Sequence, residues 1–510
     1  MTATVETKHT VVGVKPFVDD LAPRFTRLSD EVWGCPELRW EEHRSLAKQL
    51  EAAREFGGRV TEGVGGVPTA FRAEWGSGTP VIGFLGEFDA LAGLSQVAGS
   101  AVKQPDPENT SGNGHGCGHN LLGSGSLLAA VATARYLEAN GLEGTVRYFG
   151  CPAEEGAAGK TFMVAGGAFD GVDAAVSWHP MDVLMTAQWL SLAYAQLYFR
   201  FTGIASHAGA APQHGRSALD AAELMNVGAN FLREHMGDFD RIHYAFIDAG
   251  GTSPNVVQST AELYYIVRSP KVATMRALVE RIKKIAEGAA LMTETQVEVE
   301  FDGACAEYLP NEVLERALHA HTVELGGVPF DEADQAFAGT FVDGLPRAAM
   351  LKVLGLPKDT PALLEGVLPL PDPRHRMQMT GSTDVADVSW TVPTVQITGA
   401  TWAIGTPPHS WQAVAQGKSP SAHKGMIHAA TVMAAMAADL FTNRALLDAA
   451  KAEHAATWPR PRTTTRSPRA PSRRRCGRGT VRRRRRRVDA DARRRRPPAS
   501  GTMAQAPFPP

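Results

Sequence analysis

Two imidazoles and a thiol crowd into the glycine-rich stretch 114–120, which reads GHGCGHN. Its glycines let the backbone take left-handed turns, so the loop can curl until Cys117 and His119 point at one spot. A thiolate and a neutral imidazole are good ligands for zinc and similar divalent ions. Apolar residues at helical spacing follow from Leu121 to Leu137, so the loop is predicted to open a helix. A tight turn with one buried cysteine and an incidental histidine is the alternative interpretation.

Carboxylates and another histidine follow three apolar runs that are typical of buried strands. They are Asp89 after 81–86, Glu154 and Glu155 after 144–149, and His179 after 174–178. Open α/β sheets place their functional residues at the carboxyl ends of such strands. Of two adjacent carboxylates, one can bind a metal while the other takes a proton from water. The alternatives are a helix N-cap at Asp89, a solvated turn at the glutamates and a structural role for His179.

The remaining periodicities predict an α/β fold with a central sheet flanked by helices. Helical spacing within 17–56, 311–326 and 422–439 surrounds the predicted strands, and 394–397 is predicted to return to the same sheet. His409 lies on a loop after that returning strand.

Residues 193–301 break this pattern, because their predicted order is β-α-β-β-α-β, as in a ferredoxin-like unit. Ser217, with Asp220 three residues later, is a good N-cap for its first helix. We therefore predict an inserted domain. The predicted organisation is a first catalytic segment at 14–192, the insert at 193–302, a second catalytic segment at 303–445 and a disordered Arg/Pro-rich tail at 458–510.

Composition and charge limit the classes to which the protein can belong. The net charge of −2 is the sum of −18 for the body of the chain and +16 for the tail at 458–510, which contains 18 arginines and two aspartates. An acidic body argues against nucleic-acid binding, although the tail alone has the charge of a polyanion-binding arm. Five scattered cysteines do not form a disulfide pattern, and no leader or long apolar run stands out. We expect a cytoplasmic protein without a membrane partner.

Several separate strings, in order, carry a family resemblance from about Phe17 to Asp439. They are GEFDAL, GHGCGHNLLG, PAEEG, WHP, SHAGAAP, GRSALDA, GGTSPNVV and PPHSWQ. The chain resembles the M20 family of metallopeptidases and amidohydrolases, in the branch of the aminobenzoyl-glutamate, indole-acetyl-amino-acid and hippurate hydrolases. The resemblance implies a catalytic α/β domain with an inserted dimerisation domain.

The resemblance also implies roles for single residues. The residues that match the family's metal ligands are Cys117, His119, Glu155, His179 and His409. Glu154 matches the family's general base, and Asp89 matches an acidic residue that supports the metal site. His207, in SHAGAAP, reaches across a dimer to the partner's active site, and Asn255 and Arg268 match positions associated with the substrate's carboxylate. One departure is Asn120, where most of the amidohydrolase branch has Asp.

The implied activity is metal-dependent hydrolysis of the amide bond in an N-acyl or N-aroyl amino acid similar to p-aminobenzoyl-glutamate. Two divalent ions, zinc or else manganese or cobalt, would activate the water, and Glu154 would take its proton. A dipeptidase, an auxin-conjugate or hippurate-type hydrolase and a non-catalytic binding protein are the alternatives. The implied assembly is a homodimer, or a hetero-oligomer with a related subunit.

Overall fold

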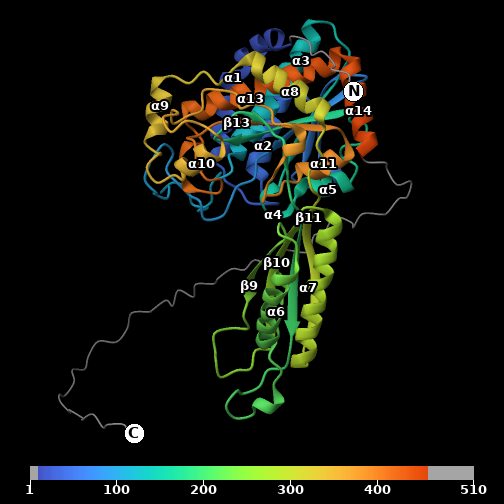
Figure 1. Ribbon diagram of the computed structural model, residues 1–510, viewed down its shortest axis with the longest axis vertical. Helices are drawn as coiled ribbons and strands as arrows, with labels where there is room; N and C mark the ends of the chain where they lie inside the picture. Colours follow the sequence, from blue (N-terminus) through green and yellow to red (C-terminus); the bar gives the residue numbers. More distant parts are fainter. Residues whose placement is uncertain (1–9, 458–510) are drawn as a thin grey trace, which may run out of the picture. The chain divides into compact units, whose positions relative to one another are not determined.

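The structure is a computed structural model that describes residues 10–457 (Figure 1). The predicted tail, 458–510, lies outside the described residues. The elements before the insert are α1 (Val11–Trp33), α2 (His43–Glu55), β1 (Arg59–Glu62), β2 (Phe71–Ser77), β3 (Val81–Glu87), α3 (His119–Ala139), β4 (Gly144–Cys151), α4 (Glu154–Ala157), α5 (Gly159–Ala165), β5 (Ala174–Met181), β6 (Met185–Thr186) and β7 (Trp189–Leu190). Those after it are α8 (Glu312–Leu325), α9 (Glu332–Gly339), α10 (Arg347–Val353), β12 (Met377–Gln378), α11 (Val385–Thr391), β13 (Thr394–Ala400), α12 (Trp411–Gln416), α13 (Pro420–Thr442) and α14 (Arg444–Thr457).

The central sheet has seven strands in the order β1-β2-β4-β3-β5-β13-β6. Its middle strands β4, β3, β5 and β13 are parallel, and the outer strands pair antiparallel. β3 is buried along its whole length, with Ile82 and Phe84 in one core and Leu85 in the other. An unbroken apolar run is what a parallel strand covered on both faces requires. The predicted α/β fold class is confirmed.

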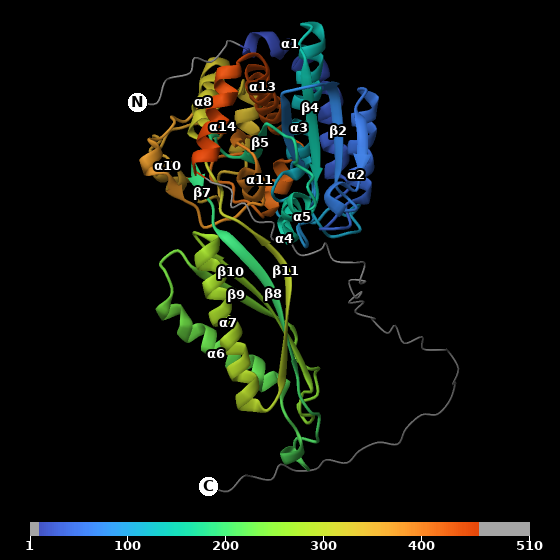
Figure 2. The ribbon, with the colours of Figure 1, turned by 90° about the vertical axis from the view of Figure 1, so that its right-hand side faces the viewer.

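Helices cover both faces of this sheet. α1, α3 and α13 pack together over one face (Figure 2), and α5 and α11 contribute to the smaller core on the other. Among the described helices, α13 alone could cross a membrane by length and composition, but 83% of its apolar window is buried inside the protein. The apolar composition of α13 is therefore explained by its burial in the protein core.

The insert is built from β8 (Ala193–Thr202), α6 (Ala218–Leu232), β9 (Arg241–Asp248), β10 (Thr260–Ser269), α7 (Val272–Thr293) and β11 (Gln296–Cys305). The four strands form a separate antiparallel sheet in the order β11-β8-β10-β9, with the predicted β-α-β-β-α-β sequence. Ser217 caps α6 as predicted, because its side chain accepts a hydrogen bond from the Asp220 N–H. The first and last strands pair, so that Tyr194 lies opposite Cys305.

Two bounds differ from the sequence interpretation. β11 runs to Cys305, three residues beyond the boundary placed at 302. α14 begins at Arg444 and extends past the boundary placed at 445, and its Glu453 accepts the N–H groups of Glu312 and Val313 at the start of α8. α14 therefore packs as a component of the catalytic body.

Candidate active site

The predicted site residues gather where the parallel strands of the central sheet end. In β3 and β4, Glu87 lies opposite Cys151, so the loops after both strands leave the same edge. β5 carries His179 near its end at that edge, and α3 begins there with His119. Strand ends and a helix start thus bring together side chains from distant regions of the sequence.

The five predicted metal ligands form two groups that share one thiol. Cys117, His119 and His179 make one group and Cys117, Glu155 and His409 the other, with the ligand atoms of each group within 4.8 Å of one another. The Cys117 Sγ lies 3.4 Å from the His179 Nε2, and the His409 Nε2 lies 3.1 Å from a Glu155 carboxylate oxygen. This geometry brings all five residues to one place.

Asp89 orients two of these ligands. Its Oδ1 accepts the hydrogen bond of the His119 Nδ1 at 2.8 Å, and its Oδ2 accepts the Glu155 backbone N–H at 2.9 Å. The His179 Nδ1 likewise donates to the Pro180 carbonyl at 2.8 Å. In both histidines the other ring nitrogen, Nε2, is thereby left to face the ligand cluster. Asp89 therefore contacts two of the predicted ligands and is not a helix N-cap, because the residue before α3 is Gly118.

The site fits divalent cations. Its carboxylates are Glu87, Asp89, Glu154, Glu155 and Asp384, and within the described chain the ammonium group of Lys160 lies among them. Three of its buried atoms make no hydrogen bond, namely Glu87 Oε2, His119 Nε2 and Glu155 Oε1. Burial raises the pKa of the Cys117 thiol well above its ordinary value, so a thiolate there requires a cation beside it. A bound divalent cation would compensate the excess negative charge of these carboxylates. It would also coordinate the ligand atoms that make no hydrogen bond.

Two turns with positive φ place the ligands. Ala153 adopts φ +59° immediately before α4, and its N–H donates at 2.9 Å to the buried Glu42, whose pKa burial raises to about 8. His409 adopts φ +58°, and its N–H donates to the Gly116 carbonyl, which sets this histidine beside the shared thiol of Cys117. Non-glycine residues rarely adopt positive φ, and these two of the five in the described chain adjoin the ligand cluster.

A cavity of about 360 Å³ opens onto the ligands. Cys117, Glu154, Glu155, His179 and His409 line one side of it, and its remaining lining includes Trp189, Tyr194, Ile266, Arg268, Met379 and Ser382. The guanidinium of Arg268 donates to the Ser382 hydroxyl at 2.8 Å and lies over the Tyr194 ring. Arg268 therefore belongs to the cavity wall and is not a surface charge.

The structure does not bring His207 and Asn255 into this cavity. Neither residue lines it, and both are exposed on the insert. They lie together there, because the Ala208 N–H donates to the Asn255 carbonyl at 2.9 Å. Asn120, the departure from the family pattern, donates to Ser29 and to the Gly417 carbonyl and so has a buried structural role.

Sequence reasoning missed four buried charged residues at the site. Glu87 stands at the start of the GEFDAL string, whereas Lys160, Glu42 and Asp384 lie outside all the strings that carry the family resemblance. Lys160 pairs with Glu87 and with Asp384, each at 2.5 Å. The available signal was Glu87 itself, a carboxylate ending an otherwise apolar strand.

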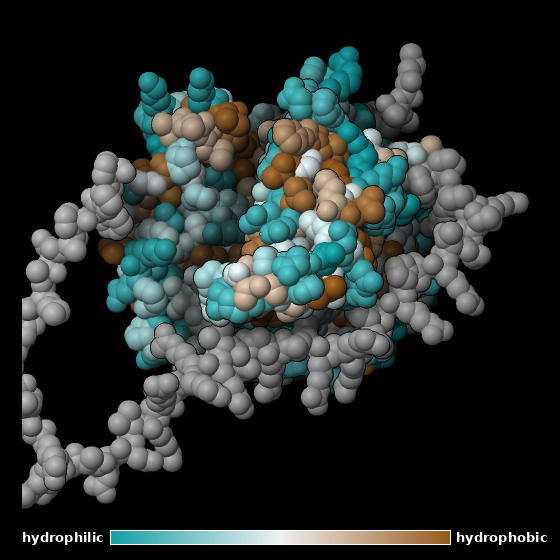
Figure 3. Space-filling model, turned by 90° about the horizontal axis from the view of Figure 1, so that it is seen from below, coloured by the Kyte–Doolittle hydropathy of each residue, from teal (hydrophilic) through white to brown (hydrophobic). Residues whose placement is uncertain are grey.

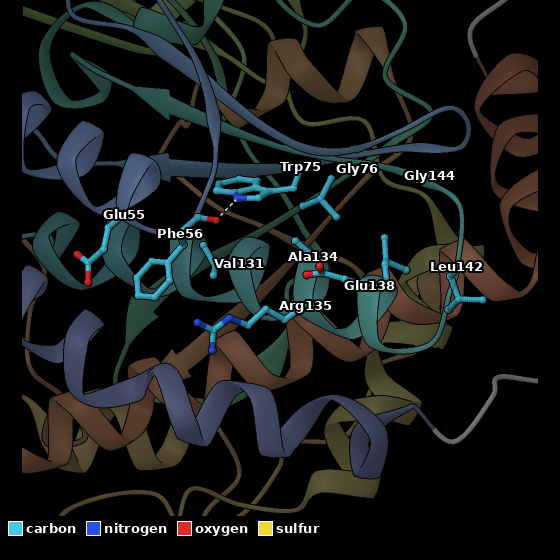
Figure 4. Close-up of a pocket in the computed structure, with 12 residues that line it drawn as sticks. Glu55, Phe56, Trp75, Gly76, Val131, Ala134, Arg135, Glu138, Leu142 and Gly144 are labelled. Atoms are coloured by element: carbon cyan, nitrogen blue, oxygen red, sulfur yellow. Dashed lines mark hydrogen bonds between the residues drawn. The ribbon is translucent and has the colours of Figure 1, made fainter.

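A larger cavity of about 570 Å³ lies elsewhere, between α3 and the β2–β4 region of the sheet (Figure 4). Its walls include Phe56, Trp75 and Val131, and the Trp75 indole N–H donates to the Phe56 carbonyl. Arg135 lies over the Phe56 ring and pairs with Asp20. Neither cysteine nor histidine lines it, so it lacks the metal-type ligands of the smaller cavity.

Residues 83–342 match the model of Peptidase family M20/M25/M40. The chain belongs to this family. This M20 chain is 45% identical to the B subunit of p-aminobenzoyl-glutamate hydrolase from Escherichia coli (strain K12), over 86% of this chain and 94% of that protein. It is also 32% identical to the Xaa-Arg dipeptidase of Mus musculus, over 61% of this chain and 70% of that protein.

The fold agrees with this membership. An aminobenzoyl-glutamate utilization protein from Klebsiella pneumoniae superposes with a TM-score of 0.53 at 19% identity, over 79% of this chain and 96% of that one. At that identity the likeness shows the fold alone. Together with the family match, the site identifies this M20 chain as a metal-dependent hydrolase of amide bonds.

Proposed function

We propose that the protein hydrolyses the amide bond between an aroyl or acyl group and an amino acid, with p-aminobenzoyl-glutamate as the type of substrate. One observation carries this proposal: a guanidinium, that of Arg268, lines the same cavity as the metal-type ligands and Glu154. The cavity therefore offers a carboxylate-binding group and hydrolytic groups together. The 45% identity to the B subunit of the Escherichia coli hydrolase supports an aroyl amino acid over a dipeptide.

The residues have separate tasks in this proposal. Cys117, His119, Glu155, His179 and His409 hold two divalent cations, with zinc proposed and manganese or cobalt as alternatives. Bound there, the cations supply Lewis-acid polarisation of the scissile carbonyl and lower the pKa of water. Glu154 takes the proton of the attacking water and passes it to the leaving amine. Arg268 holds the carboxylate of the amino acid with two parallel hydrogen bonds.

The test of substrate class is the release of free amino acid from a panel of N-acyl amino acids after loading with zinc, manganese or cobalt. We expect the highest kcat/KM with an aroyl glutamate and much lower values with a simple dipeptide. Faster hydrolysis of dipeptides than of every aroyl amino acid would favour the dipeptidase alternative. No hydrolysis of any member, with metal bound, would favour a non-catalytic binding protein.

Replacing Arg268 by methionine is expected to lower kcat/KM for an N-aroyl amino acid by about 10–100-fold, the usual cost of losing a hydrogen bond to a charged group. The matched control is the corresponding substrate with its α-carboxylate converted to an amide. Wild type and Arg268→Met should hydrolyse that amide at similar rates. Steady-state kinetics on both substrates give the answer, and an equal loss on both would remove the carboxylate-binding role.

Replacing Cys117 by alanine is expected to remove both cations, because this thiol belongs to both ligand groups. His179→Ala should remove one, because His179 belongs to one group. Metal per chain, measured by atomic emission on purified protein, distinguishes these results. Cys151→Ala is the matched control, since Cys151 is a buried free cysteine at the end of β4 and is expected to keep full metal. Full metal in Cys117→Ala would contradict the assignment.

The proposed assembly is a homodimer formed through the insert. α6 exposes Val227 and Phe231, and the edge strand β9 exposes Phe246 and Ile247. These elements adjoin, because a side chain of α6 contacts the Tyr244 hydroxyl on β9. Figure 3 shows apolar residues in patches among hydrophilic ones on the face seen from below. An apolar helix beside an unpaired strand edge suits a two-fold contact.

A hetero-oligomer with a related subunit is the alternative assembly, since the Escherichia coli relative is named as one subunit of its hydrolase. Mass measurement of the purified chain in solution separates the two assemblies.

We also propose a cytoplasmic location, because the four described cysteines are free, as is usual in a reducing compartment. Recovery of the protein with periplasmic or membrane fractions would contradict it.

A further inference from the structure

The turn before α2 holds both ends of α4, the short helix that begins with Glu154. Glu42 accepts the N–H of Ala153, the residue before α4, at 2.9 Å. Arg39 donates through its Nη1 to the carbonyl of Gly156 within α4. A side chain at position 156 would collide with Arg39, so this contact explains the glycine of the PAEEG string.

Trp40 fixes the conformation of this turn. Arg39 and Trp40 are the middle residues of a turn that is closed by a hydrogen bond of 2.9 Å from the Glu41 N–H to the Leu38 carbonyl. Trp40 adopts φ +66°, and its ring packs edge-on against Phe162 of α5 with 5.6 Å between ring centroids. A residue with positive φ persists where its surroundings enforce it. The Arg39 side chain is therefore held against α4.

The same guanidinium nitrogen also reaches the insert. Arg39 Nη1 lies 2.8 Å from the Asp302 Oδ2, and the Tyr264 hydroxyl donates to that oxygen at 2.7 Å. Asp302 lies at a β-bulge, because the register of β11 against β8 shifts between Phe301 and Gly303. Bulges redirect side chains and are common beside active sites. This bulge places the Asp302 carboxylate within reach of Arg39.

Two further features connect this link to the site. A Cβ at Gly303 would lie 2.7 Å from the Ala157 carbonyl oxygen, so the backbone of β11 runs directly against α4 (Figure 1). Tyr264 and Arg268 lie four residues apart on β10, so both side chains point to the same face of its sheet. The contacts therefore lead from the helix that carries the proposed base, through Arg39, to the strand that carries the proposed carboxylate-binding group.

We propose that Arg39 is a positioning residue, which holds the insert against α4 and so sets the separation between Arg268 and Glu154. The proposal deepens the proposed function and rests on it for the roles of those two residues. Arg39 neither lines the cavity nor belongs to the ligand groups, so it acts through α4 and Asp302. The separation matters because a displacement of about 1 Å at a reacting group can lower the rate by about 100-fold.

Steady-state kinetics on an N-aroyl amino acid test the link. Arg39→Met and Asp302→Ala should each lower kcat/KM by about 10–100-fold. The double variant should lose no more than the larger single loss, because both changes break one link. On the substrate whose α-carboxylate is an amide, Asp302→Ala should match wild type. Arg39→Met should still be slower on that amide, because it also releases α4.

Lys271→Met is the matched control for these variants. Lys271 forms another ion pair at the insert, with Glu307 just beyond β11, at 3.6 Å, and its side chain is 64% exposed. Exposed pairs of this kind contribute little, and this one does not contact α4. Lys271→Met should keep the wild-type kcat/KM on both substrates.

A distance measurement tests the placement of the insert without any activity. Nitroxide labels at Leu291→Cys on α7 and Val102→Cys on the catalytic body report that placement, because both positions are exposed. The four described native cysteines are buried, and Cys476→Ser removes the fifth. An excess of unlabelled chain, exchanged into any oligomer, restricts the signal to distances within one chain.

The distribution of label distances should broaden in Arg39→Met and in Asp302→Ala and stay unchanged in Lys271→Met. Unchanged distributions in the first two variants, or kinetic losses that add in the double variant, would overturn the proposal. If Arg39→Met does not fold, Asp302→Ala decides by the same two readouts. If wild type hydrolyses no N-aroyl amino acid, the proposed function fails, and the distance distributions still decide whether Arg39 positions the insert.

Discussion

Replacing Glu154 by glutamine is expected to lower kcat by about 10²–10⁴-fold, the range usual for the loss of general acid–base catalysis. Glu154 begins α4 and lines the cavity, next to the metal-type ligand Glu155. Burial raises the pKa of Glu154 well above its ordinary value, and the negative charges of Glu87 and Asp384 add to this effect. A carboxylate in such a setting is a stronger base than one in water. The amide of glutamine has the same shape and accepts no proton.

Metal content and substrate affinity provide the controls for this variant. Neither Cys117-containing ligand group includes Glu154, so Glu154→Gln should retain its metal and much of its affinity for substrate. Glu154 does lie close to Glu87 and His119, in a third group of potential ligands. Loss of metal from Glu154→Gln would therefore mean that Glu154 is a ligand and that the roles of the two adjacent glutamates are reversed.

His207→Ala is expected to lower kcat by about 10²-fold or more, the usual effect of removing a group that stabilises the developing oxyanion. In one chain, His207 is exposed on the insert and does not line the cavity. We therefore expect a second chain to supply it. The exposed apolar surface of α6 and β9 provides a contact through which two inserts can pair.

Mixing the two inactive variants tests this arrangement. In a dimer of His207→Ala with Glu154→Gln, one site keeps its own Glu154 and receives an intact His207 from the other chain. Random pairing makes half the dimers mixed, each with one working site, so activity should return to about a quarter of wild type. Exchange of subunits is confirmed separately by differential labelling. No recovery despite exchange would place His207 in its own chain's site or outside catalysis.

Local patterns in the sequence predicted the sheet and part of the ligand cluster, whereas the choice of Glu155 over Glu154 and the inclusion of His409 came from the family resemblance. The apolar run at 81–86 and the spacing of Cys117 and His119 are visible directly. Parallel strands then force their ends together, whatever the distance in sequence. The alternation of apolar and polar residues within 193–301 likewise predicted the sheet of the insert, because side chains on a strand of a half-buried sheet point to opposite faces in turn.

Other features of the site depend on pairings that no local pattern contains. Lys160 lies in a short helix, α5, and its partner Asp384 is 224 residues away. Charged residues are usually exposed, so nothing near either residue indicates a buried pair. The placement of His207 depends on a second chain, and its role stays a prediction.

The pairing of Tyr194 with Cys305 makes the insert a removable module. Residues directly opposite each other in antiparallel strands have Cα atoms about 4.5–5.5 Å apart, so the chain leaves and re-enters the catalytic body at almost one point. A short linker can bridge that gap, as domain insertions usually allow. Every proposed metal ligand lies outside the insert, whereas Arg268 and His207 lie within it. Excision would therefore separate metal binding from substrate recognition, and exchange of inserts between relatives would transfer recognition and pairing together.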